Sequence, residues 1–384
     1  MTVLGQSRQM AEIEVTPPGK GRMRAIADGS VRVMIVDDSA VLSGIVSRWI
    51  DEDPDLEVVA RHVNGKQAIE DVARSGPDVI VLDVDMPVMG GLDALPLLTR
   101  ACPKARVLMV STLTRRNAEI SLKALELGAV DYVAKPETSN KAGGLPEFRR
   151  ELMSKLKGLA PCRSLRPRGT GDGVGAGRFV LRPFSVRPPS VIVIGSSTGG
   201  PEALSKLLVD IAPSLGRTPV LVAQHMPPIF TAALAERLAY VTGIEAAEAR
   251  GGQALTGGQI HVAPGGHHMT IEAGAPPRIA IRAGPAVNFY RPSVDLLFNS
   301  AADVFGSRAL GIVLTGMGSD GTDGAVRIAD AGGTVIAQDM RSSAIWGMPG
   351  SAAEAGACAA ILPLGDIATV TSQLLAGRHP EVRP

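Results

Sequence analysis

Three polar residues in the second half of this 384-residue chain each follow a short apolar run. Ser197 comes just after VIVIG, His225 directly follows VLVAQ, and Asp320 lies shortly beyond GIVLTG. If these runs are parallel strands of one sheet, their carboxyl ends bring the three side chains to one edge. There a histidine takes the proton of a serine, while a carboxylate orients the imidazole and stabilises its charged form. The pattern therefore predicts a serine nucleophile that attacks an ester.

The stretch GSSTGG at residues 195–200 has other readings. Its glycines lack the G-x-G-x-x-G spacing of a dinucleotide site, and a Walker loop would need a Gly-Lys pair. A plain turn between a strand and a helix stays open for the motif taken alone. The order Ser, His, Asp also differs from the Ser, Asp, His order of α/β-hydrolases. Glycines here would let an ester approach the backbone, and amides at the start of the next helix would help to hold an oxyanion.

Carboxylates gather at strand ends in the first half of the chain. Asp37 and Asp38 end the run VRVMIVDD, and Asp83 ends a later run within VLDVDMP. Such a cluster suits Mg²⁺, and near a cation one carboxylate can accept a phosphoryl group. Lys135 after a further strand would supply a point charge, and Ser111 a hydroxyl donor. Taken singly, Asp37 and Asp38 are equally well explained as helix caps.

The ordered motifs VDDS, LDVDMP, MVST and YVAKP over residues 31–150 resemble a CheY-like receiver domain. By that resemblance Asp83 is the phosphoacceptor, and Mg²⁺ supports its phosphorylation. The resemblance implies a magnesium site at Asp37, Asp38, Asp83 and the backbone carbonyl of Asp85, and a switch group of Ser111, Tyr132 and Lys135.

Apolar runs alternate with amphipathic stretches along the whole chain, which predicts α/β structure with parallel sheets. Strands are expected at 31–38, 56–60, 78–85, 105–112 and 130–136, and again at 190–195, 219–226, 259–264, 309–316, 333–338 and 358–364. We therefore expect two doubly wound domains, a flavodoxin-like receiver and a Rossmann-like serine-hydrolase domain. The expected division is a disordered extension at 1–30, a receiver at 31–158, an Arg-, Gly- and Pro-rich linker at 159–189, a catalytic domain at 190–378 and a tail at 379–384.

Composition excludes several classes of protein. A formal net charge of +1 and an aromatic content of 3% argue against nucleic-acid binding. Three scattered cysteines do not make a disulfide framework or a zinc site. No apolar run reaches the ~18 residues of a membrane span. We expect a cytoplasmic protein, most simply a monomer, that does not insert into membranes.

The second half carries IGSSTGGPEAL, AQHMPPIFTAALAERL, HVAPGGHHM, GPAVNFYRPSVDLLF, LTGMGSDG and IWGMP, which together resemble the catalytic domain of the CheB family of chemotaxis methylesterases. By that resemblance Ser197 is the nucleophile, with Ser196 in a place where the family has alanine, His225 is the base, and Asp320 is its partner. Met317 would offer a backbone amide to the oxyanion, with Thr198 close to the site.

The resemblance implies a phosphorylation-activated enzyme of chemotactic adaptation. It would hydrolyse glutamate methyl esters on chemoreceptors, deamidate glutamine, and take phosphate from a histidine kinase, with no cofactor for the hydrolysis itself. A serine hydrolase acting on another ester is the main alternative. A receiver fused to a non-catalytic binding module and a transcription factor are the others.

Other polar residues of the second half have structural explanations first. His267 and His268 lack the companions of a metal site, and His261 alternates within a strand. Arg291 is equally explained by loop anchoring and by substrate steering. Trp346 is expected in the core or in the wall of the crevice.

Overall fold

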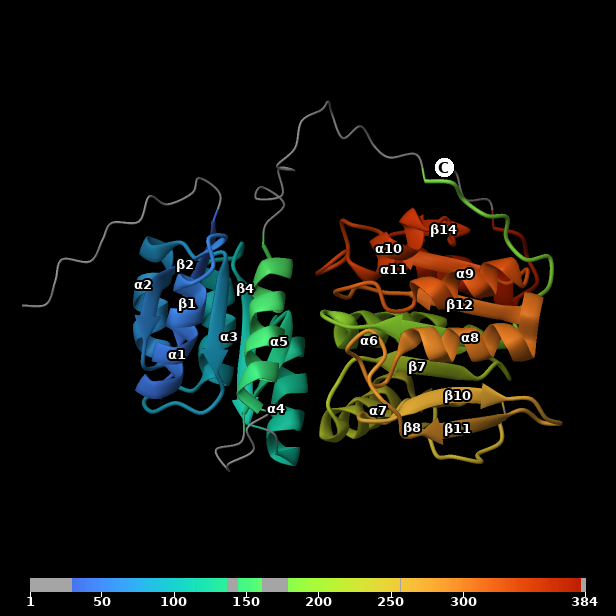
Figure 1. Cartoon of the computed structure of the whole chain (residues 1–384), viewed down its shortest axis with the longest axis horizontal. Helices are drawn as coiled ribbons and strands as arrows, with labels where there is room; N and C mark the ends of the chain where they lie inside the picture. The colour runs from blue at the N-terminus through green and yellow to red at the C-terminus, as the bar shows by residue number, and fades with distance from the viewer. Residues whose placement is uncertain (1–29, 113, 137–143, 161–178, 256, 381–384) are drawn as a thin grey trace, which may run out of the picture.

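The computed structural model describes residues 30–112, 114–136, 144–160, 179–255 and 257–380. They form two α/β domains that lie side by side, each built on a parallel sheet (Figure 1). The predicted fold class is therefore confirmed.

The first domain has a five-stranded sheet in the order β2-β1-β3-β4-β5, with every neighbouring pair parallel. This is the flavodoxin-like strand order. Its elements are β1 (Val31–Val36), α1 (Ala40–Asp51), β2 (Leu56–His62), α2 (Gly65–Ser75), β3 (Val79–Asp83), α3 (Gly91–Ala101), β4 (Arg106–Thr112), α4 (Arg115–Glu126), β5 (Asp131–Lys135) and α5 (Gly144–Gly158).

Local sequence explains how these elements begin and end. All five residues of β3 are buried, because helices cover both faces of a parallel sheet. The N-cap of α1 is Ser39, whose side chain accepts from the amide of Leu42. Asp37 and Asp38 are therefore not needed as caps. Helix α2 stops at Gly76, which adopts the left-handed conformation that glycine allows at a helix end.

The second domain has a seven-stranded parallel sheet in the order β14-β13-β12-β6-β7-β9-β8. A separate antiparallel pair, β10–β11, lies beside it. The elements are β6 (Val191–Ser196), α6 (Gly200–Ile211), a 3-10 turn (Ala212–Ser214), β7 (Val220–Gln224), α7 (Pro228–Thr242), β8 (Ala246–Glu248), β9 (Ile260–Val262), β10 (His268–Glu272), β11 (Arg278–Arg282), α8 (Val294–Phe305), a second 3-10 turn (Gly306–Arg308), β12 (Ala309–Val313), α9 (Thr322–Asp330), β13 (Thr334–Gln338), α10 (Met348–Glu354), β14 (Ala360–Leu362) and α11 (Leu364–Leu375).

All six strands expected in this half are present. Strand β8 and the β10–β11 pair were not predicted from the sequence. Strand β6 is buried along its whole length, and β7 and β12 flank it, so the strand ends that carry the predicted site residues lie together in the middle of the sheet.

The predicted boundaries are only partly within the described residues. Residues 1–29, 161–178 and 381–384 lie outside them, so the extension, most of the linker and most of the tail stay predictions. Residues 179–189, assigned to the linker, pack on the second domain. The amide of Arg182 donates to Cys358 O at 2.9 Å, and Ser185 Oγ donates to Ser307 O at 2.7 Å.

Helices α4 and α5 of the first domain face the second domain (Figure 1). The Tyr132 ring of β5 stacks on the Phe230 ring of α7, with centroids 4.2 Å apart and planes 6° from parallel. Arg237 of α7 forms an ion pair with Glu126 of α4. Apolar residues of both domains therefore share one packed boundary.

Candidate active site

The turn between β6 and α6 presents two serines with different surroundings. Ser196 is fully buried, and its Oγ donates to Gln224 Oε1 at 2.6 Å. Ser197 is 7% exposed, and its amide donates to Thr315 O at 3.1 Å. A Cβ on Gly316 would lie 2.9 Å from the Ser197 Cβ, so only glycine fits beside this serine. Because the Ser196 hydroxyl is already committed, Ser197 is the better candidate for a nucleophile.

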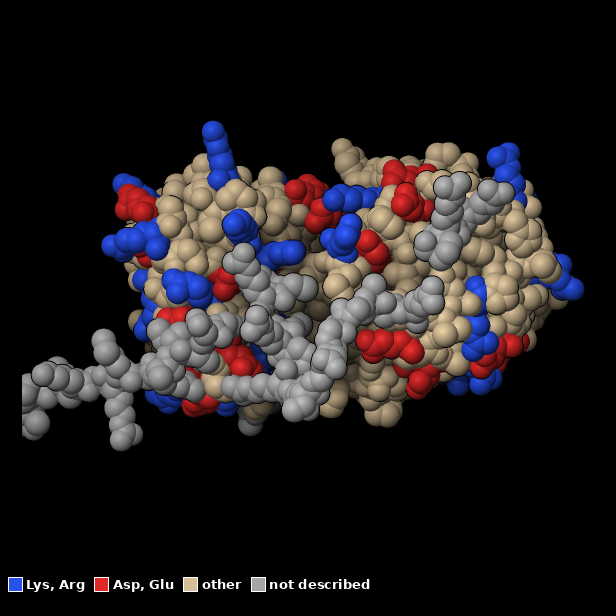
Figure 2. All heavy atoms as spheres, turned by 90° about the horizontal axis from the view of Figure 1, so that it is seen from above, with Lys and Arg blue, Asp and Glu red and all other residues tan. Residues whose placement is uncertain are grey.

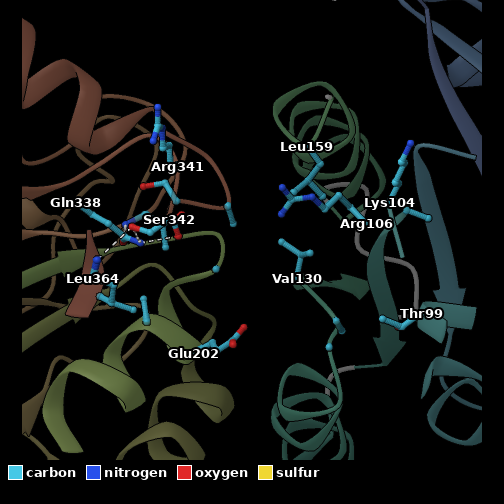
Figure 3. Close-up of a pocket in the computed structure, with 18 of the residues that line it drawn as sticks. Thr99, Lys104, Arg106, Val130, Leu159, Glu202, Gln338, Arg341, Ser342 and Leu364 are labelled. Carbon is cyan, nitrogen blue, oxygen red and sulfur yellow. Dashed lines mark hydrogen bonds between the residues drawn. The ribbon is translucent and has the colours of Figure 1, made fainter. Parts of the chain in front are cut away.

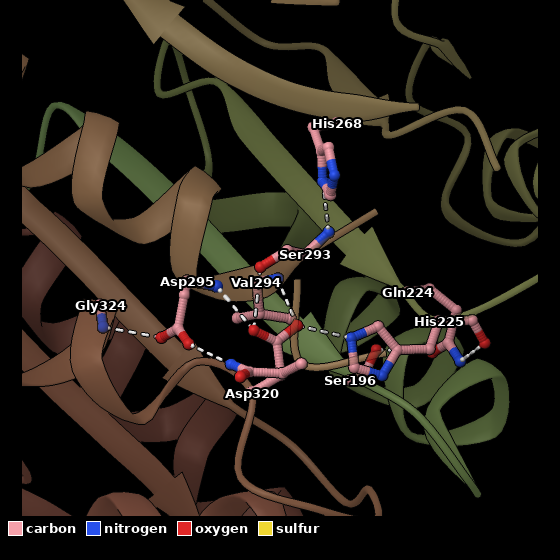
Figure 4. A network of polar contacts seen from close by, with 10 residues as sticks. Ser196, Gln224, His225, His268, Ser293, Val294, Asp295, Asp320 and Gly324 are labelled. Carbon is pink, nitrogen blue, oxygen red and sulfur yellow. Dashed lines mark hydrogen bonds and ion pairs between the residues drawn. The ribbon is translucent and has the colours of Figure 1, made fainter. Parts of the chain in front are cut away.

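His225 follows β7 and meets Asp320 at the same edge of the sheet (Figure 4). The imidazole Nε2 donates to Asp320 Oδ2 at 2.8 Å, although 95 residues separate the two in the chain. Nδ1 is buried and has no hydrogen-bond partner in the described part of the chain. The Ser197 hydroxyl therefore makes no hydrogen bond to Nδ1 in this structure.

Asp320 is almost fully buried and accepts four hydrogen bonds. Oδ2 receives His225 and the amide of Val294 at 2.7 Å, while Oδ1 receives Ser293 Oγ at 2.9 Å and the amide of Asp295 at 3.2 Å. Burial raises the pKa of the Asp320 carboxyl, but the bonds and charge of His225 and the two amides outweigh it, so the net pKa is lowered. The group is thus held as a carboxylate.

Thr198 and Met317 border the same turn. Thr198 is buried, its Oγ1 has no partner among the described residues, and its carbonyl accepts from Thr315 Oγ1 at 2.9 Å. Met317 lies at the domain boundary, where its sulfur accepts from Ser154 Oγ of α5 at 3.0 Å. The predicted oxyanion and near-site roles of both residues stay proposals.

Several histidines and their neighbours have structural roles. His268 Nδ1 accepts from the amide of Ser293 at 3.2 Å, and its Nε2 donates to Pro285 O at 2.9 Å, so it holds the residue that donates to Asp320. His261 is buried within β9, and burial lowers its pKa. Arg291 donates to Gly284 O at 2.5 Å, which anchors its loop.

The carboxylates of the first domain also come together. Ligand oxygens of Asp37, Asp38 and Asp83 lie within 4.8 Å of one another. Lys135 Nζ bridges two of them, at 2.9 Å from Asp37 Oδ2 and 2.7 Å from Asp83 Oδ2. Burial raises the pKa of Asp83 to about 6, although Lys135 acts to lower it. Asp85 is exposed two residues further on. An oxygen-only cluster of this kind fits a hard divalent cation.

The two residues of the predicted switch pair, Ser111 and Tyr132, have different partners in this structure. Ser111 is buried, and its hydroxyl shares a hydrogen bond of 3.1 Å with Ser121. Tyr132 points toward the second domain, against Phe230. A buried lysine of α5, Lys155, donates to Tyr132 O at 2.7 Å. The tyrosine thus connects the first domain with the domain that carries Ser197.

A cleft of about 600 Å³ runs between the domains (Figure 3). On one side it reaches Gly199, in the turn after Ser197, and on the other it reaches Lys104 and Arg106 of the first domain. Seen from above, charged side chains of both signs lie along the boundary (Figure 2). Among the described residues, the lining of this cleft includes Gly199 and Thr315 near the serine turn, but not Ser197, His225 or Asp320 themselves.

Sequence reasoning missed three residues that build the site. Gln224 Nε2 donates to the carbonyls of Ser197 at 2.9 Å and His225 at 3.3 Å, and so ties the two together. Ser293 donates to Asp320, and Tyr290 stacks on His225. The one feature of the sequence that could have indicated Gln224 is its position immediately before His225. The other two contacts depend on the fold.

The first domain has an acidic cluster bridged by a lysine at its sheet edge, and the second has a histidine–carboxylate pair beside a serine turn. Together these features define a response regulator with a hydrolase-type output domain. Residues 33–142 match the family model of the response regulator receiver domain, and residues 192–371 match that of the CheB methylesterase. The chain belongs to the family of CheB-type protein-glutamate methylesterases.

Two curated relatives show this membership, and one solved structure is similar to part of the chain. The protein-glutamate methylesterase/protein-glutamine glutaminase of group 2 operon from Bradyrhizobium diazoefficiens is 46% identical over 91% of this chain and 95% of its own length. A relative from Caulobacter vibrioides, protein-glutamate methylesterase/protein-glutamine glutaminase 2, is 48% identical over 88% of this chain and 96% of its own. The crystal structure of the Thermotoga maritima CheB methylesterase catalytic domain is 36% identical, covers 48% of this chain and 98% of that one, and has a TM-score of 0.47.

Proposed function

We propose that the protein hydrolyses glutamate methyl esters on chemoreceptors, with release of methanol, and deamidates receptor glutamine, with release of ammonia. The reaction would serve chemotactic adaptation in the cytoplasm. The observation that carries the proposal is the His225–Asp320 hydrogen bond beside the Ser197 turn. The names of the relatives supply the substrate class.

In the proposed reaction Ser197 Oγ attacks the ester carbonyl. Because Nε2 of His225 faces Asp320, Nδ1 is the nitrogen left to take the serine proton. The same proton then goes to the leaving methanol, and water cleaves the acyl-enzyme by the reverse sequence. Backbone amides at Met317 and Thr198 would hold the oxyanion, and one such donor is typically worth about 3 kcal/mol. Asp320, held ionised, stabilises the imidazolium.

We infer that phosphorylation of Asp83 by a histidine kinase controls this site. Asp37, Asp38 and Asp83 would hold Mg²⁺ with the backbone carbonyl of Asp85, and the cation would neutralise the incoming phosphoryl charge. Lys135, already bonded to Asp83, would neutralise the phosphoaspartate.

The packing of the two domains supports an inhibitory role for the receiver. Its helix α5 contacts Met317 through Ser154, and its β5 stacks Tyr132 on Phe230. Met317 follows Gly316, which lies beside Ser197, so the receiver packs close to the turn that carries this serine. Phosphorylation would weaken this contact by drawing Tyr132 toward Ser111. A tenfold rise in activity needs only about 1.4 kcal/mol of difference between the two states.

Methanol release from methylated receptor fragments tests the function. Wild type should release methanol faster with a phosphodonor, Ser197→Ala should release none, and the matched Ser196→Ala should keep most of the activity. Methanol release by Ser197→Ala at the wild-type rate would refute the nucleophile. Turnover of simple esters without receptor methanol would favour a different ester substrate.

Removal of residues 1–188 tests the inhibition. The truncated protein should show higher basal activity than the unphosphorylated full chain. A lower or equal rate, with the circular dichroism of a folded domain, would contradict inhibitory packing.

A further inference from the structure

The Tyr290 ring lies flat on the imidazole of His225. The ring centroids are 3.7 Å apart, and the planes are 5° from parallel. The edge of the same imidazole is bound to Asp320. The imidazole is therefore held along one edge by a hydrogen bond and across one face by an aromatic ring.

The turn that carries Tyr290 is fixed tightly in place. Val287 and Tyr290 exchange backbone hydrogen bonds of 3.1 and 2.8 Å, and the two residues between them have positive φ, 50° at Asn288 and 71° at Phe289. Positive φ is unfavourable for a bulky residue such as phenylalanine, so the surroundings must impose it.

One contact ties this turn to the carboxylate of the site. Asn288 Nδ2 donates to Asp295 Oδ2 at 3.0 Å, and the amide of Asp295 donates to Asp320. Gly324 also donates to Asp295, at 2.8 Å, so this carboxyl is fixed from both sides. The tyrosine is thus anchored to the same framework that positions Asp320.

The ring of Tyr290, rather than its hydroxyl, makes the contact with the histidine. The hydroxyl oxygen lies 3.6 Å from where a Cβ on Gly318 would be, on the side of the receiver domain. Burial raises the pKa of this phenol, which leaves it protonated at neutral pH. A proton-transfer role for the hydroxyl is therefore not required by the geometry.

We propose that Tyr290 is a positioning residue for the hydrolysis, holding the imidazole of His225 in the plane where Nε2 meets Asp320 and Nδ1 remains available to Ser197. The proposal rests on the hydrolase function proposed above. Without the ring, the imidazole is free to turn about its Cβ–Cγ bond, and the productive orientation is populated less. A misplaced reacting group costs roughly 10²-fold in rate.

Tyr290→Leu and Tyr290→Phe separate the ring from the hydroxyl in the full-length protein, activated with a phosphodonor and Mg²⁺. We expect Tyr290→Leu to lower kcat for methanol release by roughly 10²-fold with KM little changed, and Tyr290→Phe to stay near wild type. A Leu variant as active as wild type, or a Phe variant as impaired as Leu, overturns the proposal. If Leu lowers the melting temperature, Tyr290→Thr replaces it.

A second measurement does not depend on the receptor substrate. The rate at which a phosphonofluoridate labels Ser197 should fall in Tyr290→Leu and stay near wild type in Tyr290→Phe. If labelling is slower only in Tyr290→Leu but neither wild type nor any variant releases methanol, Tyr290 does position His225 and the proposed substrate class is wrong. Equal labelling of wild type and both variants would overturn the positioning role itself.

Discussion

Replacement of Asp320 by asparagine removes one charge while nearly preserving shape. An amide has a single acceptor oxygen, whereas Asp320 accepts on both of its oxygens. The backbone amide of Val294 can only donate a hydrogen bond, so it needs an acceptor at the position of Oδ2, 2.7 Å away. The Ser293 hydroxyl, which donates to Oδ1, can rotate and accept a hydrogen bond from an amide nitrogen instead. The remaining donor on Oδ1, the Asp295 amide, is longer at 3.2 Å. The asparagine oxygen should therefore take the place of Oδ2, and the bond from His225 should survive.

The expected loss then comes from the missing charge alone. Two unit charges about 4 Å apart interact by about 4 kcal/mol at an effective dielectric constant of 20. The imidazolium that forms as Ser197 attacks loses that stabilisation, so kcat should fall by about 10³-fold. If the amide instead turned its nitrogen toward His225, the wrong tautomer would be enforced, and the loss would approach the ~10⁴-fold seen in such cases.

Methanol release by the phosphodonor-activated enzyme measures this change. Melting temperatures of wild type and Asp320→Asn show whether the fold is kept, and the exposed Asp323→Asn, three residues away, serves as the matched control. A fall of less than tenfold with an unchanged fold, or an equal fall in the control, would refute the charge argument.

Two further substitutions, one of them with a matched control, test how the domains are built. Gly200→Ala would place a Cβ 2.0 Å from Gln224 Oε1, so we expect a loss of about 1–3 kcal/mol in thermal unfolding, together with lower activity. Gly44→Ala, which meets nothing within 4 Å, should be neutral or stabilising, and equal effects of the two would contradict the packing. Lys155→Met would leave the buried Asp131, 2.8 Å from Lys155 Nζ, without its partner. Chemical denaturation should show a loss of about 3–5 kcal/mol, and an unchanged midpoint would show that the pair is not needed.

Much of the fold follows directly from apolar patterning. Runs such as VIVLD and VIVIGS are buried along their whole length, so a parallel sheet covered on both faces is the natural prediction. The β10–β11 pair was missed although HMTIE and RIAIR both alternate, as half-buried strands do. The expectation of uninterrupted parallel α/β structure outweighed that local signal. Strand β8, with three residues, is too short to show a period.

The residues of the candidate site likewise fall into two groups: those that the sequence pattern indicates and those that depend on tertiary packing. Ser197, His225 and Asp320 were predicted because each follows an apolar strand, and strand ends converge in this fold. The contacts of Tyr290 with His225 and of Ser293 with Asp320 have no local signature. They arise from the path of one loop over the sheet edge, which only tertiary packing determines.

If phosphorylation acts through the domain contact at Tyr132 and Phe230, the coupling between the domains is reciprocal. If phosphorylation favours separated domains, a receptor that binds only the separated form must strengthen, by the same factor, the affinity of the receiver for Mg²⁺ and a phosphoryl analogue. Receptors rich in methyl esters would then stabilise the active form of the enzyme that demethylates them. Demethylation of the receptors would remove this stabilisation.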